Sequence, residues 1–175
     1  NCIGEIFNRT HQIFLDCNVA DYEILVIDNG SRFDEHQGLL ELAKKNNVRV
    51  LTLSRNFGYQ GALWAGLDHA SGDPIVFMDG DGEDRPEELN LLFNKSKENP
   101  DKVITADRVK RAEGPLFKFC YLMHKYLTFV FAGQSIKFGN YTCLPKPVVD
   151  GMAQSSSTWS SFSGSLTKLV KDRTS

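Results

Sequence analysis

The sequence lacks a basic surplus, closely spaced cysteines and any long apolar run. Its 175 residues carry 20 Lys and Arg against 22 Asp and Glu, a formal net charge of −2, which argues against nucleic-acid binding because such surfaces are basic. Four cysteines (Cys2, Cys17, Cys120 and Cys143) form no C-x-x-C pair, so neither a zinc knuckle nor a disulfide framework is indicated, and a reducing cytoplasm suits them. No apolar stretch of about 18 residues and no signal-peptide pattern is present, so we expect no membrane span and no secretion of this segment by itself.

What the sequence does contain is an apolar pattern that alternates between strand and helix. Short apolar runs occur at residues 22–28, 48–54, 74–79 and 102–107, and residues at helical spacing separate them. Strands that are buried on both faces and separated by helices are typical of a parallel sheet between layers of helices. We therefore predict a single α/β domain with a mostly parallel sheet flanked by helices. The serine-rich residues 155–165 are predicted to form a loop.

Polar residues follow each of the four predicted strands. They are Asp28, residues 54–58, residues 79–83 and residues 107–111. In open α/β sheets, ligands bind beyond the carboxyl ends of the strands. The sequence thus predicts that the chemistry of the protein lies at these four places.

One of these places, IVFMDGDGED at residues 75–84, runs from an apolar strand into alternating acids and glycines. On an extended backbone, Asp79, Asp81 and Glu83 would share one side and could converge on one divalent ion. Mg²⁺ and Mn²⁺ prefer oxygen ligands, and one or two carboxylates commonly hold them together with substrate phosphates. Gly80 leaves room for a ligand close to the backbone. We therefore expect a Mg²⁺ or Mn²⁺ site and a substrate that carries a diphosphate.

Two other metal or phosphate chemistries compete for this cluster. A calcium EF-hand loop is excluded, because the sixth and twelfth positions counted from Asp79 hold Asp84 and Asn90 in place of glycine and glutamate. A phosphatase of the haloacid-dehalogenase kind also has D-x-D-G after an apolar strand. In that family, however, the motif follows the first strand and precedes Thr or Val, whereas here at least two strands come before it and Glu83 follows. The phosphatase stays as an alternative function.

Helix capping is a structural interpretation of part of the same cluster. Asp84, Glu87 and Glu88 flank Pro86 at the start of a predicted helix, where acids favour the positive end of the helix dipole. We expect these three acids to cap that helix. Capping leaves the two aspartates of the D-x-D motif unexplained.

Four ordered blocks of the sequence resemble glycosyltransferase family 2. They are ILVIDNGS, LSRNFGYQGALWAGLDHASGD, MDGDGEDRPEEL and FGNYTCLPKPVVDGM, and they are most similar to the polyprenyl-phosphate sugar transferases of that family, such as dolichol-phosphate mannose synthase and its bacterial relatives. The resemblance covers about residues 1–152. It implies the Rossmann-like GT-A fold and inverting transfer of a hexose from a nucleoside-diphosphate sugar, usually with Mg²⁺ or Mn²⁺. Residues 153–175 are then a C-terminal extension, predicted to be part of an acceptor region or a loop.

The resemblance also implies roles for individual residues. Asp28 matches the family aspartate that contacts the base or ribose, and Asp79 is expected near the ribose and diphosphate. Asp81 matches the principal metal ligand, and Glu83 stands where close relatives carry a glutamine that assists the metal. The remaining donor-binding positions that the resemblance implies are Arg55, Asn56, Gly58 and Gly80.

A basic pair, Arg108 and Arg111, matches residues that relatives use near the phosphates or the acceptor. The alternative interpretation is that both are solvated surface arginines. Lys118 is a weaker candidate for the same role. With Asp79 and Asp81, the two arginines make up the predicted catalytic set.

The sequence departs from the family at its amino end. The family opens with a strand that ends in a P-x-Y-N-E-like block, and only Asn1 matches a remnant of it, so we expect either that the first strand is lost or that the sequence is partial. Asn29 replaces the usual second aspartate of the first block. The distal acceptor loop with arginine and glycine, and the membrane helices of many relatives, are not found.

The acceptor is predicted from residues 115–133, which are rich in aromatic and aliphatic residues and carry lysines. This segment either lies in a membrane interface with its lysines near lipid phosphates or packs as a helix against other parts of the chain. A lipid phosphate is anionic and needs no general base, and the candidates for a base, Asp107 and His124, rest on position alone. We expect a polyprenyl phosphate or cell-surface glycan acceptor at the cytoplasmic membrane face. A non-catalytic nucleotide-sugar-binding protein is the remaining alternative.

Overall fold

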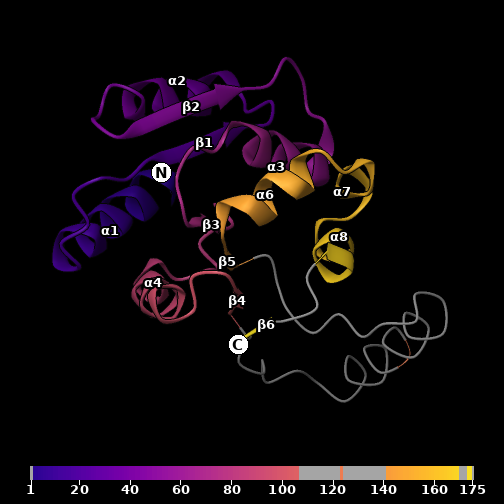
Figure 1. Cartoon of the computed structure of the whole chain (residues 1–175). Coiled ribbons are helices and arrows are strands. Elements are labelled where there is room, and N and C mark those ends of the chain that lie inside the picture. The colour runs from indigo at the N-terminus through magenta and orange to yellow at the C-terminus, as the bar shows by residue number, and fades with distance from the viewer. Residues whose placement is uncertain (1, 107–122, 124–140, 170–172, 175) are drawn as a thin grey trace.

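The computed structural model describes residues 2–106, 123, 141–169 and 173–174. In chain order its helices and strands are α1 (Cys2–Asp16), β1 (Ile24–Asp28), α2 (Phe33–Leu42), β2 (Val48–Thr52), α3 (Gly58–His69), β3 (Ile75–Phe77), the 3-10 helix η1 (Pro86–Glu88), α4 (Leu89–Glu98), β4 (Val103–Thr105), β5 (Thr142–Leu144), α6 (Lys146–Ala153), α7 (Ser156–Ser160), α8 (Phe162–Leu169) and β6 (Arg173–Thr174). The four predicted strands are confirmed as β1 to β4. The alternation of strands and helices confirms the α/β class (Figure 1).

The strands form two sheets. β1 and β2 pair in parallel, from Ile24 opposite Val48 to Asp28 opposite Thr52. The second sheet has the order β3-β5-β4-β6, in which β5 runs antiparallel to both β3 and β4 while β4 and β6 are parallel. The prediction of a mostly parallel sheet is therefore wrong for the second sheet. The three-residue strand β5 is too short for its sequence to reveal either its existence or its direction.

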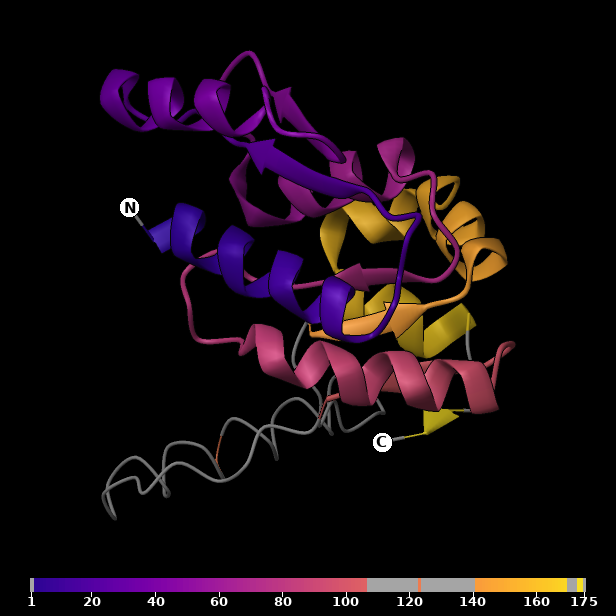
Figure 2. The ribbon, with the colours of Figure 1, turned by 90° about the vertical axis from the view of Figure 1, so that its left-hand side faces the viewer.

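Helices cover the strands on two sides. α1 and α4 lie on one side, and α3, α6 and α8 lie on the other (Figures 1 and 2). Between α3, α6, α8 and the second sheet lies a core cluster that includes Leu67, Leu144, Met152 and Phe162. Between α4 and the same sheet lies a second cluster that includes Cys143, which is 1% exposed. Burial raises the pKa of the Cys143 thiol to about 11.

The serine-rich segment is helical, so its prediction as a loop is wrong. α7 and α8 occupy most of it, and Phe162 and Leu166, one helical turn apart, are fully buried. The Ser157 and Ser165 hydroxyls lie 2.8 Å apart and bond to each other. Two apolar anchors at helical spacing therefore outweigh a composition typical of loops. The division at residue 152 stays a prediction, although Met152 and Phe162 belong to one cluster.

No helix in the described ranges, 2–106 and 141–169, is long and apolar enough to cross a membrane. Residues 115–133, the predicted interfacial or packing segment, lie outside the described residues apart from Met123.

Candidate functional site

The buried carboxylate of Asp28 shapes the loop that follows β1. Asp28 is 2% exposed, its Oδ1 accepts a hydrogen bond from the Ser31 N–H at 2.9 Å, and its Oδ2 lies 2.7 Å from Nδ1 of His36. Burial by itself would raise the pKa of Asp28, but the bonds from Ser31 and His36 outweigh it, so the pKa lies below its ordinary value. Both carboxylate oxygens are thus engaged within the protein. Contact between Asp28 and a nucleotide stays a prediction.

Asn29 joins this loop to the loop before α3. Its Nδ2 donates to Oδ1 of Asn56 at 3.2 Å and to the carbonyl of Gly58 at 3.1 Å, and its Oδ1 accepts from the Phe57 N–H at 2.9 Å. A carboxylate has no N–H to donate, so an aspartate could make only the last of these bonds. The departure from the family pattern at position 29 therefore creates a bridge that aspartate could not form. Sequence reasoning missed this role, and the amide in place of the usual acid was the available signal.

Close backbone approach explains Gly30 of the first loop, and a positive φ explains Gly58 of the second. Gly30 has a φ of +84°, and a Cβ there would lie 3.0 Å from the backbone N of Asn56. Gly58 has a φ of +77°, which side chains rarely adopt. Between these contacts, the exposed Arg55 stacks its guanidinium over the Phe57 ring at 4.2 Å from the centroid. The predicted Arg55, Asn56 and Gly58 thus belong to one connected structure beside the end of β1.

A hydrogen bond to Asp79 connects the D-x-D loop to α3. Its Oδ1 accepts a 2.6 Å hydrogen bond from the hydroxyl of Tyr59, and its backbone N–H donates to Oδ2 of Asp84 at 2.9 Å. Tyr59 is 46% exposed and follows Gly58 in the first turn of α3. Sequence reasoning missed Tyr59, although its position directly after the SRNFG block was visible.

The backbone of the acidic loop turns, so the expected extended conformation is wrong. Residues 80 and 81 form a turn, Gly82 has a φ of +85°, and Oδ1 of Asp81 accepts the Glu83 N–H at 2.8 Å. In the described part of the chain, no three acids, histidines or cysteines come together as a metal cluster. Asp81 and Glu83 nevertheless are exposed oxygen donors on one turn. This donor set fits Mg²⁺ or Mn²⁺ in type when substrate phosphates complete the shell.

The acids after the loop have different structural roles. Asp84 is 6% exposed and its Oδ2 accepts a hydrogen bond from the Asp79 N–H, so it fixes the acidic loop, and its role as a helix cap stays a prediction. Glu87 and Glu88 lie in the first turn of η1, as the capping interpretation expects. Glu87 also accepts two hydrogen bonds from Arg9 of α1, at 2.7 and 2.6 Å, which lower its pKa to about 2. The acidic loop is therefore fixed at its far end by Asp84 and by α1.

The structure brings three predicted blocks to one edge. Asn29 bonds to Asn56 and Gly58, and Tyr59 of the same helix start bonds to Asp79, so the ends of β1 and β3 meet at the start of α3. Arg108 and Arg111, with Lys118, His124 and Asp107, lie outside the described residues.

Comparison with known proteins assigns the family. The profile of the family described as Glycosyl transferase family 2 matches residues 2–145, which include all three blocks. The chain therefore belongs to glycosyltransferase family 2. This membership supports the GT-A fold predicted from the sequence, of which the structure describes the helices and strands given above.

Curated relatives agree with this assignment. The chain is 35% identical over 117 residues to a protein named uncharacterized glycosyltransferase YkcC from Bacillus subtilis, a match that covers 66% of this chain. It is 35% identical over 125 residues, 70% of the chain, to the undecaprenyl-phosphate 4-deoxy-4-formamido-L-arabinose transferase of Klebsiella pneumoniae. The matches span 36% and 37% of the lengths of these relatives.

Proposed function

We propose that this protein is a metal-dependent, inverting glycosyltransferase that moves a hexose from a nucleoside-diphosphate sugar to a polyprenyl phosphate or a cell-surface glycan. The observation that carries the proposal is the meeting of the ends of β1 and β3 at the start of α3, which brings the blocks around Asn29, Asn56 and Asp79 together. Family membership supports a sugar nucleotide as donor. The name of the Klebsiella relative supports a polyprenyl phosphate as acceptor.

The exposed acids of the turn are assigned to the diphosphate end of the donor. Asp81 and Glu83 would hold Mg²⁺ or Mn²⁺, and the ion, when bound, neutralises charge on the diphosphate. Asp79, fixed by Tyr59, faces the ribose and diphosphate, and Gly80 leaves space beside it. Arg55, Asn56 and Gly58 flank the nucleotide, and Asp28 supports the loop beneath it through Ser31 and His36.

The chemistry of glycosyl transfer explains why these groups suit the site. Negative charge grows on the leaving diphosphate in the transition state, so cations that are already in place stabilise the transition state more than the ground state. Arg108 and Arg111 are proposed as protein cations for this purpose. Since a lipid phosphate is already anionic at neutral pH, it attacks without a general base. These requirements favour peripheral association at the cytoplasmic membrane face.

Calorimetric titration of UDP- and GDP-sugars with Mn²⁺, and again with EDTA, tests the proposal. We expect micromolar binding that is lost with EDTA and in Asp81→Ala. Asp101→Ala is the matched control, because Asp101 is an exposed acid at the amino end of β4, away from the carboxyl-end loops. Equal binding by the Asp81→Ala variant and the control would contradict the assignment of the metal site.

A second assay separates catalysis from binding alone. Transfer of radiolabelled sugar from the bound donor to undecaprenyl phosphate is expected to follow binding. Donor binding without transfer to either a lipid phosphate or a glycan would favour the non-catalytic alternative. The phosphatase alternative is disfavoured, because β1 and β2 precede the motif and the chain belongs to a glycosyltransferase family.

A further inference from the structure

Both tryptophans of the sequence, Trp64 and Trp159, line one open groove. The groove has a volume of about 450 Å³ and lies between α3, the end of α6 and α7. Its other lining residues are Ala153, Gln154, Ser155 and Ser156. Sites for small molecules commonly combine aromatic surface with a few polar groups that fix orientation, in cavities of about 300–1,000 Å³. The groove has this size and this composition.

Contacts with the rest of the fold hold the two indole rings in place. Nε1 of Trp64 donates to the Ala153 carbonyl at 3.0 Å, which fixes the Trp64 ring between α3 and the end of α6. The Trp159 ring meets it edge to face, with the ring centroids 5.7 Å apart and the planes at 66°. Trp159 is nevertheless 48% exposed. The groove therefore presents aromatic surface to solvent in a fixed orientation, which reduces the entropy lost when a ligand binds.

The polar groups of the groove are neutral. Gln154 and Ser156 are exposed, and their amide and hydroxyl can both donate and accept hydrogen bonds. No Lys, Arg, Asp or Glu lines the groove in the described part of the chain. An anionic ligand, such as a nucleotide or a lipid phosphate, would find no cation to pair with there. The groove therefore suits a neutral ligand that has hydroxyl groups and an apolar face.

A pyranose ring has both of these surfaces. The C–H groups on one side of the ring form an apolar face that can lie on an indole, and the hydroxyls around its rim donate and accept hydrogen bonds. A hydrocarbon chain would cover the indoles but offer no partner to the amide of Gln154 or the hydroxyl of Ser156. The composition of the groove thus favours a neutral sugar over a lipid tail.

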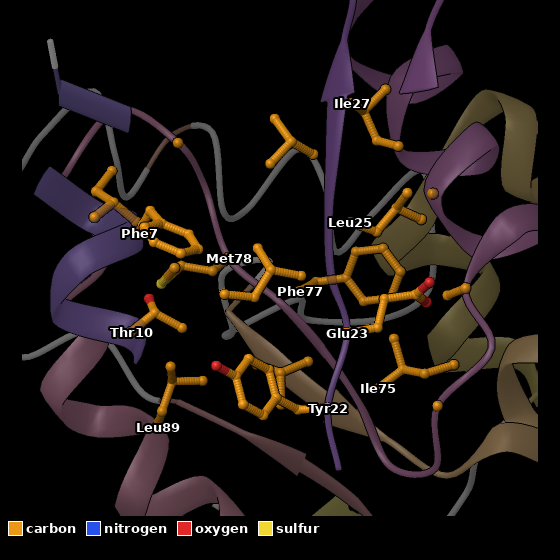
Figure 3. Close-up of a pocket in the computed structure, with 18 of the residues that line it drawn as sticks. Phe7, Thr10, Tyr22, Glu23, Leu25, Ile27, Ile75, Phe77, Met78 and Leu89 are labelled. Atoms are coloured by element: carbon orange, nitrogen blue, oxygen red, sulfur yellow. The ribbon is translucent and has the colours of Figure 1, made fainter. Parts of the chain in front are cut away.

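A second cavity is less suited to a sugar. It has a volume of about 570 Å³ and separates β1 from β3. Figure 3 shows the apolar side chains of Phe7, Leu25, Ile27 and Phe77 around it. Surface of this kind leaves the hydroxyls of a sugar without partners, which costs free energy. The groove at Trp159 is therefore the better candidate, although its volume is smaller.

The groove lies close to the donor edge, the place where the ends of β1 and β3 meet the start of α3. The Phe162 N–H, at the start of α8, donates to Oε1 of Gln60 at 2.8 Å, and Gln60 follows Tyr59, whose hydroxyl bonds to the D-x-D loop. A Cβ on Gly61 would lie 3.6 Å from Cη2 of Trp159, so this ring lies against the first turn of α3. Figure 1 shows α7 beside the start of α3.

We propose that this groove binds a neutral hexopyranose unit of a glycan acceptor, with the sugar ring on Trp159 and its hydroxyls bonded to Gln154 and Ser156. Of the two acceptors in the proposed function, the site fits the glycan. The acceptor role rests on the proposed function, because a glycan held here would lie next to the donor edge. Sugar binding itself is measured without donor or metal, so its failure is distinguishable from a failure of the transferase assignment.

Tryptophan fluorescence tests the proposal, because both tryptophans lie in the groove and no other tryptophan contributes to the emission. The probes are neutral oligosaccharides of glucose, galactose, mannose and N-acetylglucosamine, each titrated into the protein without donor or metal. We expect a saturable shift of the emission with at least one of them. The absence of a saturable shift with all of these probes would overturn the proposal.

Calorimetry on variants then tests whether the sugar occupies the groove. Trp159→Ala should weaken oligosaccharide binding by at least about tenfold, and Trp159→Phe should retain part of the affinity. Gln154→Ala leaves both indoles in place and should weaken binding by about two- to tenfold. Leu91→Ala is the matched control, since Leu91 is also an exposed apolar side chain but belongs to α4 on the opposite side of the strands. Equal binding by Trp159→Ala and the control would overturn the proposal.

Other occupants of the groove predict different results. A membrane surface predicts an emission shift with phosphatidylcholine vesicles, because tryptophan favours the membrane interface. A proline-rich segment predicts a shift with a polyproline peptide, since such segments dock in aromatic grooves. Either shift without one from the oligosaccharides would overturn the proposal.

The sugar of the donor is distinguished from a glycan by competition. The oligosaccharide is titrated into protein that is already saturated with a UDP- or GDP-sugar and Mn²⁺. We expect both ligands to bind together. Displacement of one by the other would assign the groove to the hexose of the donor and overturn the acceptor assignment.

Discussion

The two sheets differ in what holds them together. In the sheet of β3 to β6, the strands β4 and β5 are buried at every position, between α4 on one side and α8 on the other. In the sheet of β1 and β2, the equally apolar β1 is half-buried up to Ile27, and its carboxyl end is ordered by the hydrogen bonds that the Asn29 side chain donates and the Asp28 side chain accepts. Burial of a strand thus depends on a neighbour at each edge as well as on its own sequence. The first sheet is organised by its loops and the second by its packing.

The largest expected effect tests whether the two sheets differ in packing, by truncating one leucine in each. Leu144→Ala in β5, where the side chain is fully buried, should reduce the free energy of unfolding by about 3–5 kcal/mol, because the cavity adds to the lost transfer energy. Leu25→Ala in the half-buried β1 should cost only about 1–2 kcal/mol. Urea unfolding of both variants measures the difference. Equal costs would mean that Leu25 is packed as tightly in solution as Leu144.

The loops of the first sheet are tested by Asn29→Asp. The change removes the donor to Asn56 and Gly58 and should reduce the free energy of unfolding by about 0.5–1.5 kcal/mol, the net contribution of an ordinary hydrogen bond, because the exposed acceptors can bond to water instead. Asn90→Asp is the control, since Asn90 is exposed and only accepts a bond from Asn94, which an aspartate can also accept. Similar losses in the two variants, measured by urea unfolding, would argue against the bridge.

Acid should weaken the first sheet through Asp28. Because its pKa is lower in the folded protein than its ordinary value of 3.8, its stabilisation is complete above that value and is lost as the pH falls through the folded pKa. Asp28→Asn should be less stable than the parent at neutral pH. It should also lose less stability than the parent does as the pH falls from 5 through the folded pKa of Asp28. Urea unfolding along this pH series measures both effects. Parallel pH profiles for parent and variant would contradict the role of Asp28.

The smallest effect is expected for Tyr59→Phe. Loss of the exposed hydroxyl bond to Asp79 should weaken donor binding by about two- to fivefold, equivalent to about 0.5–1 kcal/mol, because the acidic loop becomes less fixed. Tyr22→Phe is a control, since Tyr22 bonds to His11 near the amino end of β1, away from the donor edge. Calorimetry with Mn²⁺ and the preferred sugar nucleotide measures both variants. An unchanged affinity in Tyr59→Phe would contradict a positioning role for Tyr59.

Much of the fold could be predicted because apolar periodicity is a local property. The runs that became β1 to β4 stand between helical patterns, and their order indicated which loops share an edge. The three-residue β5 has too few residues for a period, and the helices of the serine-rich segment depend on burial of Phe162 and Leu166. These features depend on tertiary contacts, which no local pattern contains.

The candidate site shows the same division. Its blocks were visible as polar residues after apolar runs, whereas the conformation of the acidic loop was not. The positive φ of Gly82 and the bond from the Glu83 N–H to Asp81 turn the backbone, so the expected alternation of carboxylates does not occur. Likewise, the bond from the Asp79 N–H to the Asp84 carboxylate links residues on opposite sides of that turn, and only the structure reveals it.

Chemical labelling of the buried Cys143 thiol can measure how often the second sheet opens. The thiolate is the form of cysteine that attacks alkylating reagents, and this cysteine is both 1% exposed and held as a thiol by its raised pKa of about 11. Its side chain can be labelled only after β5 separates from α4. The labelling rate of Cys143, measured by mass spectrometry on the peptide that contains it, therefore reports the rate at which this sheet unfolds cooperatively.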